Sequence, residues 1–112
     1  MLSENRRKSS RVTVHMLAGE TCGGQFFLPM LSNLSDTGLM VECPSGLEMP
    51  HTASATVELT LPGVKTIIKA RCQLVRETCH GFFRRRAMRF VDIAAVDRLH
   101  IQNYLQRACG QA

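Results

Sequence analysis

The residues in this sequence that are best suited to bind a charged ligand lie in two short clusters. In the first, four cations fall within residues 6–11 (RRKSSR). The planar guanidinium of arginine donates hydrogen bonds in pairs to phosphate oxygens, binds the O6 and N7 acceptors of guanine, and stacks on bases. These side chains can therefore close around a phosphorylated ligand, although taken alone they are more typical of a solvated basic arm.

The second cluster is the segment 33–38 (NLSDTG), which is dense in turn-forming residues. Its simplest interpretation is a structural turn, in which a polar side chain bonds the backbone and Gly38 supplies conformational freedom. In a functional interpretation, Asn33 offers an acceptor and a donor to a base edge and Ser35 offers a hydroxyl to phosphate. Gly38 then lets the backbone approach the ligand. Alone, this cluster is also a weak indication of a site.

Residues that could support catalysis or metal binding form no known pattern. The sequence contains no GxSxG, HExxH or P-loop motif, and the carboxylates are dispersed. Its five cysteines form no CxxC pair, and Cys79 and His80 are adjacent, a spacing that makes a poor chelate because neighbouring residues of an extended chain point to opposite faces. We therefore expect no enzyme activity, no metal site and no cofactor. The thiols are expected to be reduced and to pack as small apolar groups, with a thiol-based redox sensor as a remote alternative.

Composition narrows the classes of partner. The chain has 112 residues, 45% of them hydrophobic, and a net charge of +5, which fits one small globular domain with a localised site for anions. One tyrosine, five phenylalanines and no tryptophan argue against a nucleic-acid polymer as the partner. The absence of a long apolar run or a secretory signal predicts a cytoplasmic protein without a membrane span.

A second basic block covers residues 71–89, with six arginines and one glutamate. Its densest part is the triplet 84–86. The favoured interpretation of the triplet is protection of an edge strand against aggregation. An auxiliary contact to the ligand, or a site for an acidic partner, remains as an alternative.

The pattern of apolar residues predicts a mainly β fold: a small six-stranded antiparallel barrel with a C-terminal helix. The strands are expected at about 11–16, 25–31, 39–43, 55–61, 68–74 and 83–91. The segments 32–38, 44–54 and 78–81 are expected to connect them. An amphipathic helix is predicted over about 93–108, with Asp92 as its N-cap and Gly110 just beyond its end.

The two clusters together, in this order and on this fold, resemble the PilZ domain family, whose pattern is RxxxR before the first strand and [D/N]xSxxG before a later one. Here they read RKSSR at 7–11 and NLSDTG at 33–38, and VTV at 12–14, GLMVE at 38–42 and MRFVDI at 88–93 are also similar to the family. The resemblance implies binding of cyclic di-GMP, a bacterial second messenger with two phosphates and two guanines. The residues implied to bind it are Arg6, Arg7, Arg11, Asn33, Ser35 and Gly38.

Individual roles follow from the same resemblance. Arg7 and Arg11 would bind phosphate and guanine, and Asn33 and Ser35 would hold the other side of the ligand. An arginine at the position of Arg6 is associated in this family with binding of a stacked pair of nucleotides. Many members have aspartate at the position of Asn33; a carboxamide has one acceptor oxygen where a carboxylate has two, which bears on affinity.

The sequence thus predicts a cyclic di-GMP receptor with a flexible basic arm over residues 1–10 and one PilZ-like domain over 11–112. Binding is expected to order the arm and change the surface offered to an unidentified effector protein. The alternatives are a PilZ-like adaptor that binds only proteins and, less favoured, a small basic barrel that binds nucleic acid.

Overall fold

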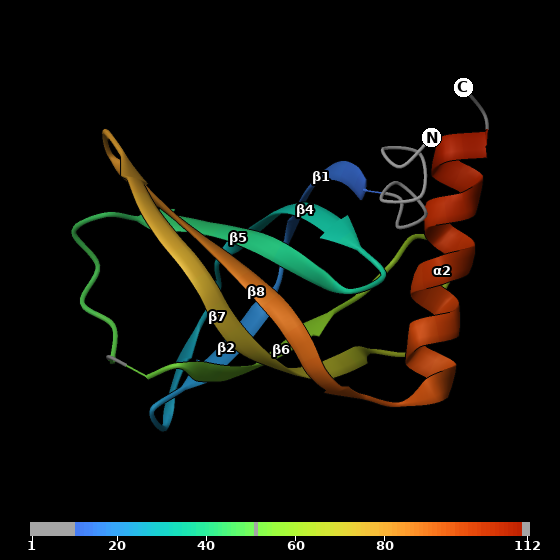
Figure 1. Cartoon of the computed structure of the whole chain (residues 1–112), viewed down its shortest axis with the longest axis horizontal. Coiled ribbons are helices and arrows are strands. Elements are labelled where there is room, and N and C mark those ends of the chain that lie inside the picture. The colour runs from blue at the N-terminus through green and yellow to red at the C-terminus, as the bar shows by residue number, and fades with distance from the viewer. Residues whose placement is uncertain (1–10, 51, 111–112) are drawn as a thin grey trace, which may run out of the picture.

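Eight antiparallel strands and one helix make up the part of the chain that the computed structural model describes, residues 11–50 and 52–110 (Figure 1). The strands are β1 (Arg11–Leu17), β2 (Gly19–Cys22), β3 (Gln25–Phe27), β4 (Met30–Ser35), β5 (Gly38–Pro44), β6 (Ser54–Leu59), β7 (Ile68–His80) and β8 (Phe83–Ile93), and the helix is α2 (Ala95–Gly110). The predicted basic arm, with Arg6 and Arg7, lies outside the described residues.

The strands form one curled sheet in the order β1-β4-β5-β8-β7-β6-β2-β3. The strands β1 and β2 are consecutive in the chain and are separated only by Ala18. Because β1 pairs with β4 at one end of the sheet and β2 pairs with β6 near the other end, the two ends of the sheet meet at Ala18. Beside this junction, Ala18 N donates a hydrogen bond of 2.9 Å to the carbonyl oxygen of Pro29. The predicted class, an antiparallel β-barrel-like fold with a C-terminal helix, is confirmed.

The strand count differs from the predicted six because two chain segments bend. The first expected strand continues beyond Ala18 as β2, and the expected strand 25–31 is divided into β3 and β4 at Pro29. Proline has no backbone N–H and cannot donate to a sheet ladder, which explains the interruption.

Alternation of apolar and polar residues positions the core as expected. On β6 the side chains of Ala55, Val57 and Leu59 are buried, and on β8 Met88 and Phe90 are buried. The helix α2 stands at one end of the curled sheet and packs on β1 and β4, burying Ile101 completely (Figure 1). No helix in the described ranges is long and apolar enough to cross a bilayer.

The boundaries of the helix were predicted incorrectly. Strand β8 extends to Ile93, and Asp92 lies in it with a carboxylate oxygen 3.9 Å from the guanidinium of Arg71, so Asp92 is not an N-cap. The helix begins at Ala95 and its last residue is Gly110. Val96, in the first turn of the helix, is 58% exposed. Cross-strand pairing in β8 thus replaces the first predicted turn of the helix.

Two predicted connections are shorter than expected. Strand β4 continues to Ser35, which leaves only residues 36–37 as the turn to β5. Strand β7 pairs with β8 as far as His80 opposite Phe83, so the expected connection 78–81 is mostly strand. Gly81, with φ of 62°, forms the tight turn of this hairpin. Pairing with a neighbouring strand thus extends β4 and β7 into segments whose residue types had predicted turns.

Candidate functional site

The turn between β4 and β5 is organised by the hydroxyl of Ser35. Its Oγ accepts hydrogen bonds from the backbone N–H groups of Thr37 and Gly38, both at 3.2 Å, and lies 3.2 Å from Gly38 O, to which it donates. Ser35 is buried. The hydroxyl therefore has a structural role in this turn, which is the simpler of the two interpretations weighed for it.

Gly38 is required by close packing between β5 and β8. A Cβ atom at this position would overlap the carbonyl oxygen of Met88 and come within 3.1 Å of the Cα of Arg89. The neighbouring Thr37 O accepts a hydrogen bond of 2.9 Å from Phe90 N. The predicted close approach at Gly38 is thus to the backbone of β8.

Pairing of β1 with β4 brings the end of the arginine motif to the second cluster. Arg11 lies opposite Ser35 and Thr13 lies opposite Asn33 in the register of the two strands. As a result, Arg11, Asn33, Ser35 and Gly38 all line one cavity of about 360 Å³, which we call the β4–β5 cavity. These four predicted site residues are brought together although 27 positions separate the first from the last.

Strands β7 and β8 contribute residues to this cavity that sequence reasoning did not assign. They are Val75 and Arg76 from β7, and Ala87, Met88 and Arg89 from β8. Arg89 donates a hydrogen bond to Gln73 Oε1, whereas Arg76 is exposed and makes no ion pair within the described residues. The basic block 71–89 was a signal for additional cations, but only the sheet order places two of them beside Arg11.

Two polar oxygens near the turn lack hydrogen bonds. Asn33 Oδ1 and Asp36 Oδ1 are both buried and have no partner among the described residues. A buried acceptor without a donor costs about 1–3 kcal/mol, so such groups are rare in folded proteins. A donor supplied by a bound molecule would remove this cost.

The helix α2 also contacts the turn. Arg98 Nη1 donates a hydrogen bond of 2.9 Å to the backbone carbonyl oxygen of Asp36. A charge-assisted hydrogen bond of this kind restrains the turn against the helix. The turn is therefore held from three sides, by Ser35, by β8 and by α2.

The arginine triplet 84–86 does not protect an edge, because β8 lies between β5 and β7 inside the sheet. Arg85 pairs with Glu42 at 2.9 Å and Arg84 pairs with Glu77 at 3.0 Å. Arg86 faces the barrel interior and forms a buried ion pair with Glu20. None of the three lines the β4–β5 cavity. The favoured interpretation of the triplet was therefore wrong, since strand order, which is not visible in the sequence, decides what an edge is.

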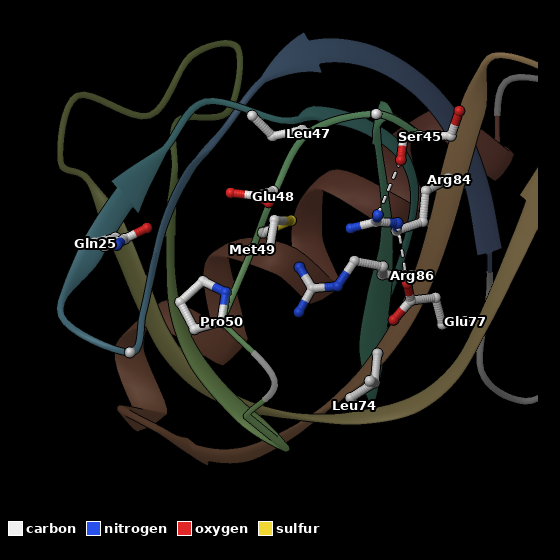
Figure 2. Close-up of a pocket in the computed structure, with 12 residues that line it drawn as sticks. Gln25, Ser45, Leu47, Glu48, Met49, Pro50, Leu74, Glu77, Arg84 and Arg86 are labelled. Carbon is white, nitrogen blue, oxygen red and sulfur yellow. Dashed lines mark hydrogen bonds and ion pairs between the residues drawn. The ribbon is translucent and has the colours of Figure 1, made fainter.

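A second and larger cavity, of about 860 Å³, lies at the other face of the sheet between β7, β8 and the loop 45–50 (Figure 2). We call it the mouth cavity. The side chains of Arg84 and Arg86 enter it from β8, with Leu74 and Glu77 beside them on β7 (Figure 2). Among residues 11–50 and 52–110, no three histidine, cysteine or acidic side chains lie together as metal ligands.

Comparison with known proteins identifies the family. The family model for the PilZ domain matches residues 5–107. A search of the curated proteins finds no match. One similar solved structure is the Bacillus subtilis inhibitor of motility, MotI/DgrA, with a TM-score of 0.82 and 19% identity over 95% of this chain and 52% of that chain. Another is the Borreliella burgdorferi PlzA protein in complex with c-di-GMP, with a TM-score of 0.69 and 10% identity over 99% of this chain and 58% of that chain.

A third is the PilZ domain of Escherichia coli YcgR with c-di-GMP, at a TM-score of 0.68 and 16% identity, covering 95% of both chains. This chain spans little more than half the length of the first two proteins. Identities this low establish the fold alone, whereas the family model covers almost the whole sequence. The predicted resemblance is thereby confirmed, and the chain belongs to the PilZ domain family.

Proposed function

We propose that this chain is a cyclic di-GMP receptor that binds the nucleotide at the β4–β5 cavity and acts on a downstream protein. The family includes solved complexes with this ligand, namely PlzA and the PilZ domain of YcgR. The proposal assigns ligand contacts to Arg11 and Asn33 in the cavity and to Arg6 and Arg7 of the motif. It includes no catalytic role and places the protein in the cytoplasm.

The observation that carries the proposal is the unpartnered Oδ1 of Asn33. This buried acceptor belongs to a residue that lines the cavity. The Watson–Crick edge of guanine presents N1–H and N2–H₂ donors, which are the groups that such an acceptor lacks. The base would therefore satisfy an atom that the described residues leave without a hydrogen bond.

The charge of the cavity suits the phosphates. Arg11, Arg76 and Arg89 all line it, and no carboxylate of the described residues does. Guanidinium groups bind phosphate through short, charge-assisted hydrogen bonds, which are about twice as strong as neutral ones. Ser35 contributes to this site chiefly by holding the turn, because its hydroxyl is already bonded to the backbone.

Calorimetric titration with cyclic di-GMP tests the proposal. We expect the parent chain to bind, and Arg11→Ala and Arg76→Ala each to weaken binding about tenfold to a hundredfold, the scale of one lost charge-assisted hydrogen bond. Asn33→Asp should bind as well as the parent or better, because a carboxylate accepts from both N1–H and N2–H₂.

Arg71→Ala is the matched control for Arg76→Ala. Arg71 is also an exposed arginine of β7, but it does not line the β4–β5 cavity. It should bind like the parent. GTP and cyclic GMP should not replace the ligand. A parent chain that is folded but gives no binding to cyclic di-GMP would contradict the proposal and favour an adaptor that contacts only proteins.

A further inference from the structure

Within the described part of the chain, one edge of β7 has no neighbouring strand over residues 75–80, almost half of the strand. On this side β7 pairs with β6 only as far as Gln73, opposite Ser54, and the last backbone bond runs from Leu74 N to Ala53 O at 2.7 Å. Val75 lies in a register shift, residues 76–80 pair with β8 and, among residues 11–50 and 52–110, with no second strand, and all six residues of 75–80 are exposed. An open strand edge presents unpaired N–H and C=O groups to which another strand can add.

The mouth cavity lies directly beside this edge. Leu74 and Glu77 of β7 form one of its walls, and the loop residues Leu47, Met49 and Pro50 form the opposite wall (Figure 2). Pro50 packs close to Gly23, at the turn between β2 and β3, which holds this part of the loop beside that turn. A backbone added to β7 would therefore have space for its alternate side chains.

The chemistry of the cavity selects the occupant. Its two arginines are neutralised, Arg84 by Glu77 at 3.0 Å and Arg86 by the buried Glu20. Leu47, Met49 and Leu74 offer half-buried apolar surface. An anionic occupant would face arginines that are already paired, whereas apolar side chains would fit these walls.

One carboxylate of this cavity remains available. Glu48 is exposed and makes no ion pair within residues 11–50 and 52–110. It lines the mouth cavity on the side of Gln25 (Figure 2), and an unpaired carboxylate there favours an occupant with a basic side chain at that point. Complementary charge of this kind orients a partner and fixes its register.

We propose that the β7 edge at residues 75–80 is a docking site for an extended segment of a partner protein. The segment adds as a strand, inserts alternate apolar side chains into the mouth cavity and places a lysine or arginine beside Glu48. A second copy of this chain fits less well, because the adjacent Arg76 and Glu77 would place a charge on each face of the added strand.

The same edge borders the β4–β5 cavity. A register shift between Leu74 and Arg76 puts Val75 and Arg76 on the wall of the β4–β5 cavity, while Leu74 and Glu77 line the mouth cavity. The docking site goes beyond the proposed function and does not depend on it, because the open edge and the mouth cavity are formed by the strands and the loop 45–50 themselves.

The test uses the capped peptide Val-Thr-Val-Thr-Lys-Thr, titrated into the isotopically labelled full chain without nucleotide. We expect chemical-shift changes and slower amide exchange at residues 75–80, with further shifts at Leu47 and Met49. Two peptides, N-methylated at the odd or at the even positions, separate strand addition from other binding. Only one of them should lose affinity, by at least about tenfold, because alternate amides of an added strand face β7.

A charge exchange tests the orientation. Glu48→Lys should weaken binding of the lysine peptide about threefold to fivefold and should improve binding of a peptide with glutamate in place of lysine. Glu58→Lys, on β6 and outside the cavity, is the control and should have no effect. Absence of binding, shifts at another surface, or equal losses for both methylated peptides would overturn the proposal. A failure to bind cyclic di-GMP would not bear on it.

Discussion

At the scale of single residues, burial decides how the cysteine thiols behave. Cys22, Cys43 and Cys72 are buried, and Cys79 and Cys109 are exposed. Loss of hydration raises the pKa of Cys72 to about 12, with a smaller contribution from the negative charge of Glu20. Burial also raises the pKa of Cys22 and of Cys43. Such thiols stay protonated and pack as small apolar groups, which argues against a redox role for these three.

The raised pKa of Cys72 predicts a loss of stability in alkali. Its pKa in the folded chain lies above the ordinary value of 9.0, so the unfolded chain releases the proton first as the pH rises. The contribution of the protonated Cys72 thiol to the free energy of unfolding is complete below pH 9. It is lost between about pH 9 and 12, at about 1.4 kcal/mol for each pH unit.

Urea unfolding at pH 8, 9, 10 and 11 measures this contribution. We expect the free energy of unfolding of Cys72→Val to fall less steeply with pH than that of the parent chain. Cys109→Val, which changes an exposed thiol, should follow the parent. Parallel curves for the parent and Cys72→Val would show that Cys72 does not titrate differently in the folded and unfolded chains.

At the scale of elements, the turn between β4 and β5 depends on its contact with β8. Gly38→Ala would force a methyl group against the backbone of Met88, which cannot move without breaking the pairing of β5 and β8. We expect a loss of about 1–3 kcal/mol in the free energy of unfolding, as is usual for overpacking. Chemical denaturation measures it.

Gly46→Ala is the matched control for this substitution. Apart from its two chain neighbours, no atom of the described residues lies within 4 Å of a Cβ at Gly46, and its loop is partly exposed, so the change should stay within about 0.5 kcal/mol of the parent. A Gly38→Ala variant as stable as Gly46→Ala would mean that β8 can retreat from the turn, and that the close approach is not required for folding.

At the scale of the whole molecule, one ion pair joins distant parts of the barrel. Glu20 on β2 is 0% exposed and Arg86 on β8 is 4% exposed, and the two lie 66 positions apart in the chain. A buried charge that loses its partner is strongly destabilising, because its desolvation is no longer compensated. The pair thus ties the two sides of the curled sheet to each other.

Glu20→Gln tests this contribution, since it removes the negative charge and preserves the shape. We expect a loss of about 3–5 kcal/mol in the free energy of unfolding. Glu58→Gln, which breaks the exposed pair with Lys69 at 3.6 Å, should cost less than about 1 kcal/mol. Replacement of both partners, as Glu20→Leu with Arg86→Met, should recover much of the loss. Similar effects of Glu20→Gln and Glu58→Gln would contradict a special role for the buried pair.

Much of the architecture could be predicted from local patterns. The alternation of Val57 and Leu59 with polar neighbours indicates a half-buried strand, because successive side chains of a strand point to opposite faces. The order of the two motifs, with Arg11 in the first and Asn33 in the second, sufficed to identify the family. Each alternating segment and each motif spans only a few residues, so the sequence displays it directly.

The remaining features depended on which strands lie side by side. Alternation along β8 shows that Arg86 and Arg89 face opposite sides, but it does not show which side is the interior. Only the position of β8 between β5 and β7 puts Arg86 against Glu20, and Arg89 and Arg76 beside Arg11. The open edge of β7 likewise results from where β6 ends. Such pairings join residues far apart in the chain, and the tertiary structure selects them because only that arrangement closes the core and compensates its buried charges.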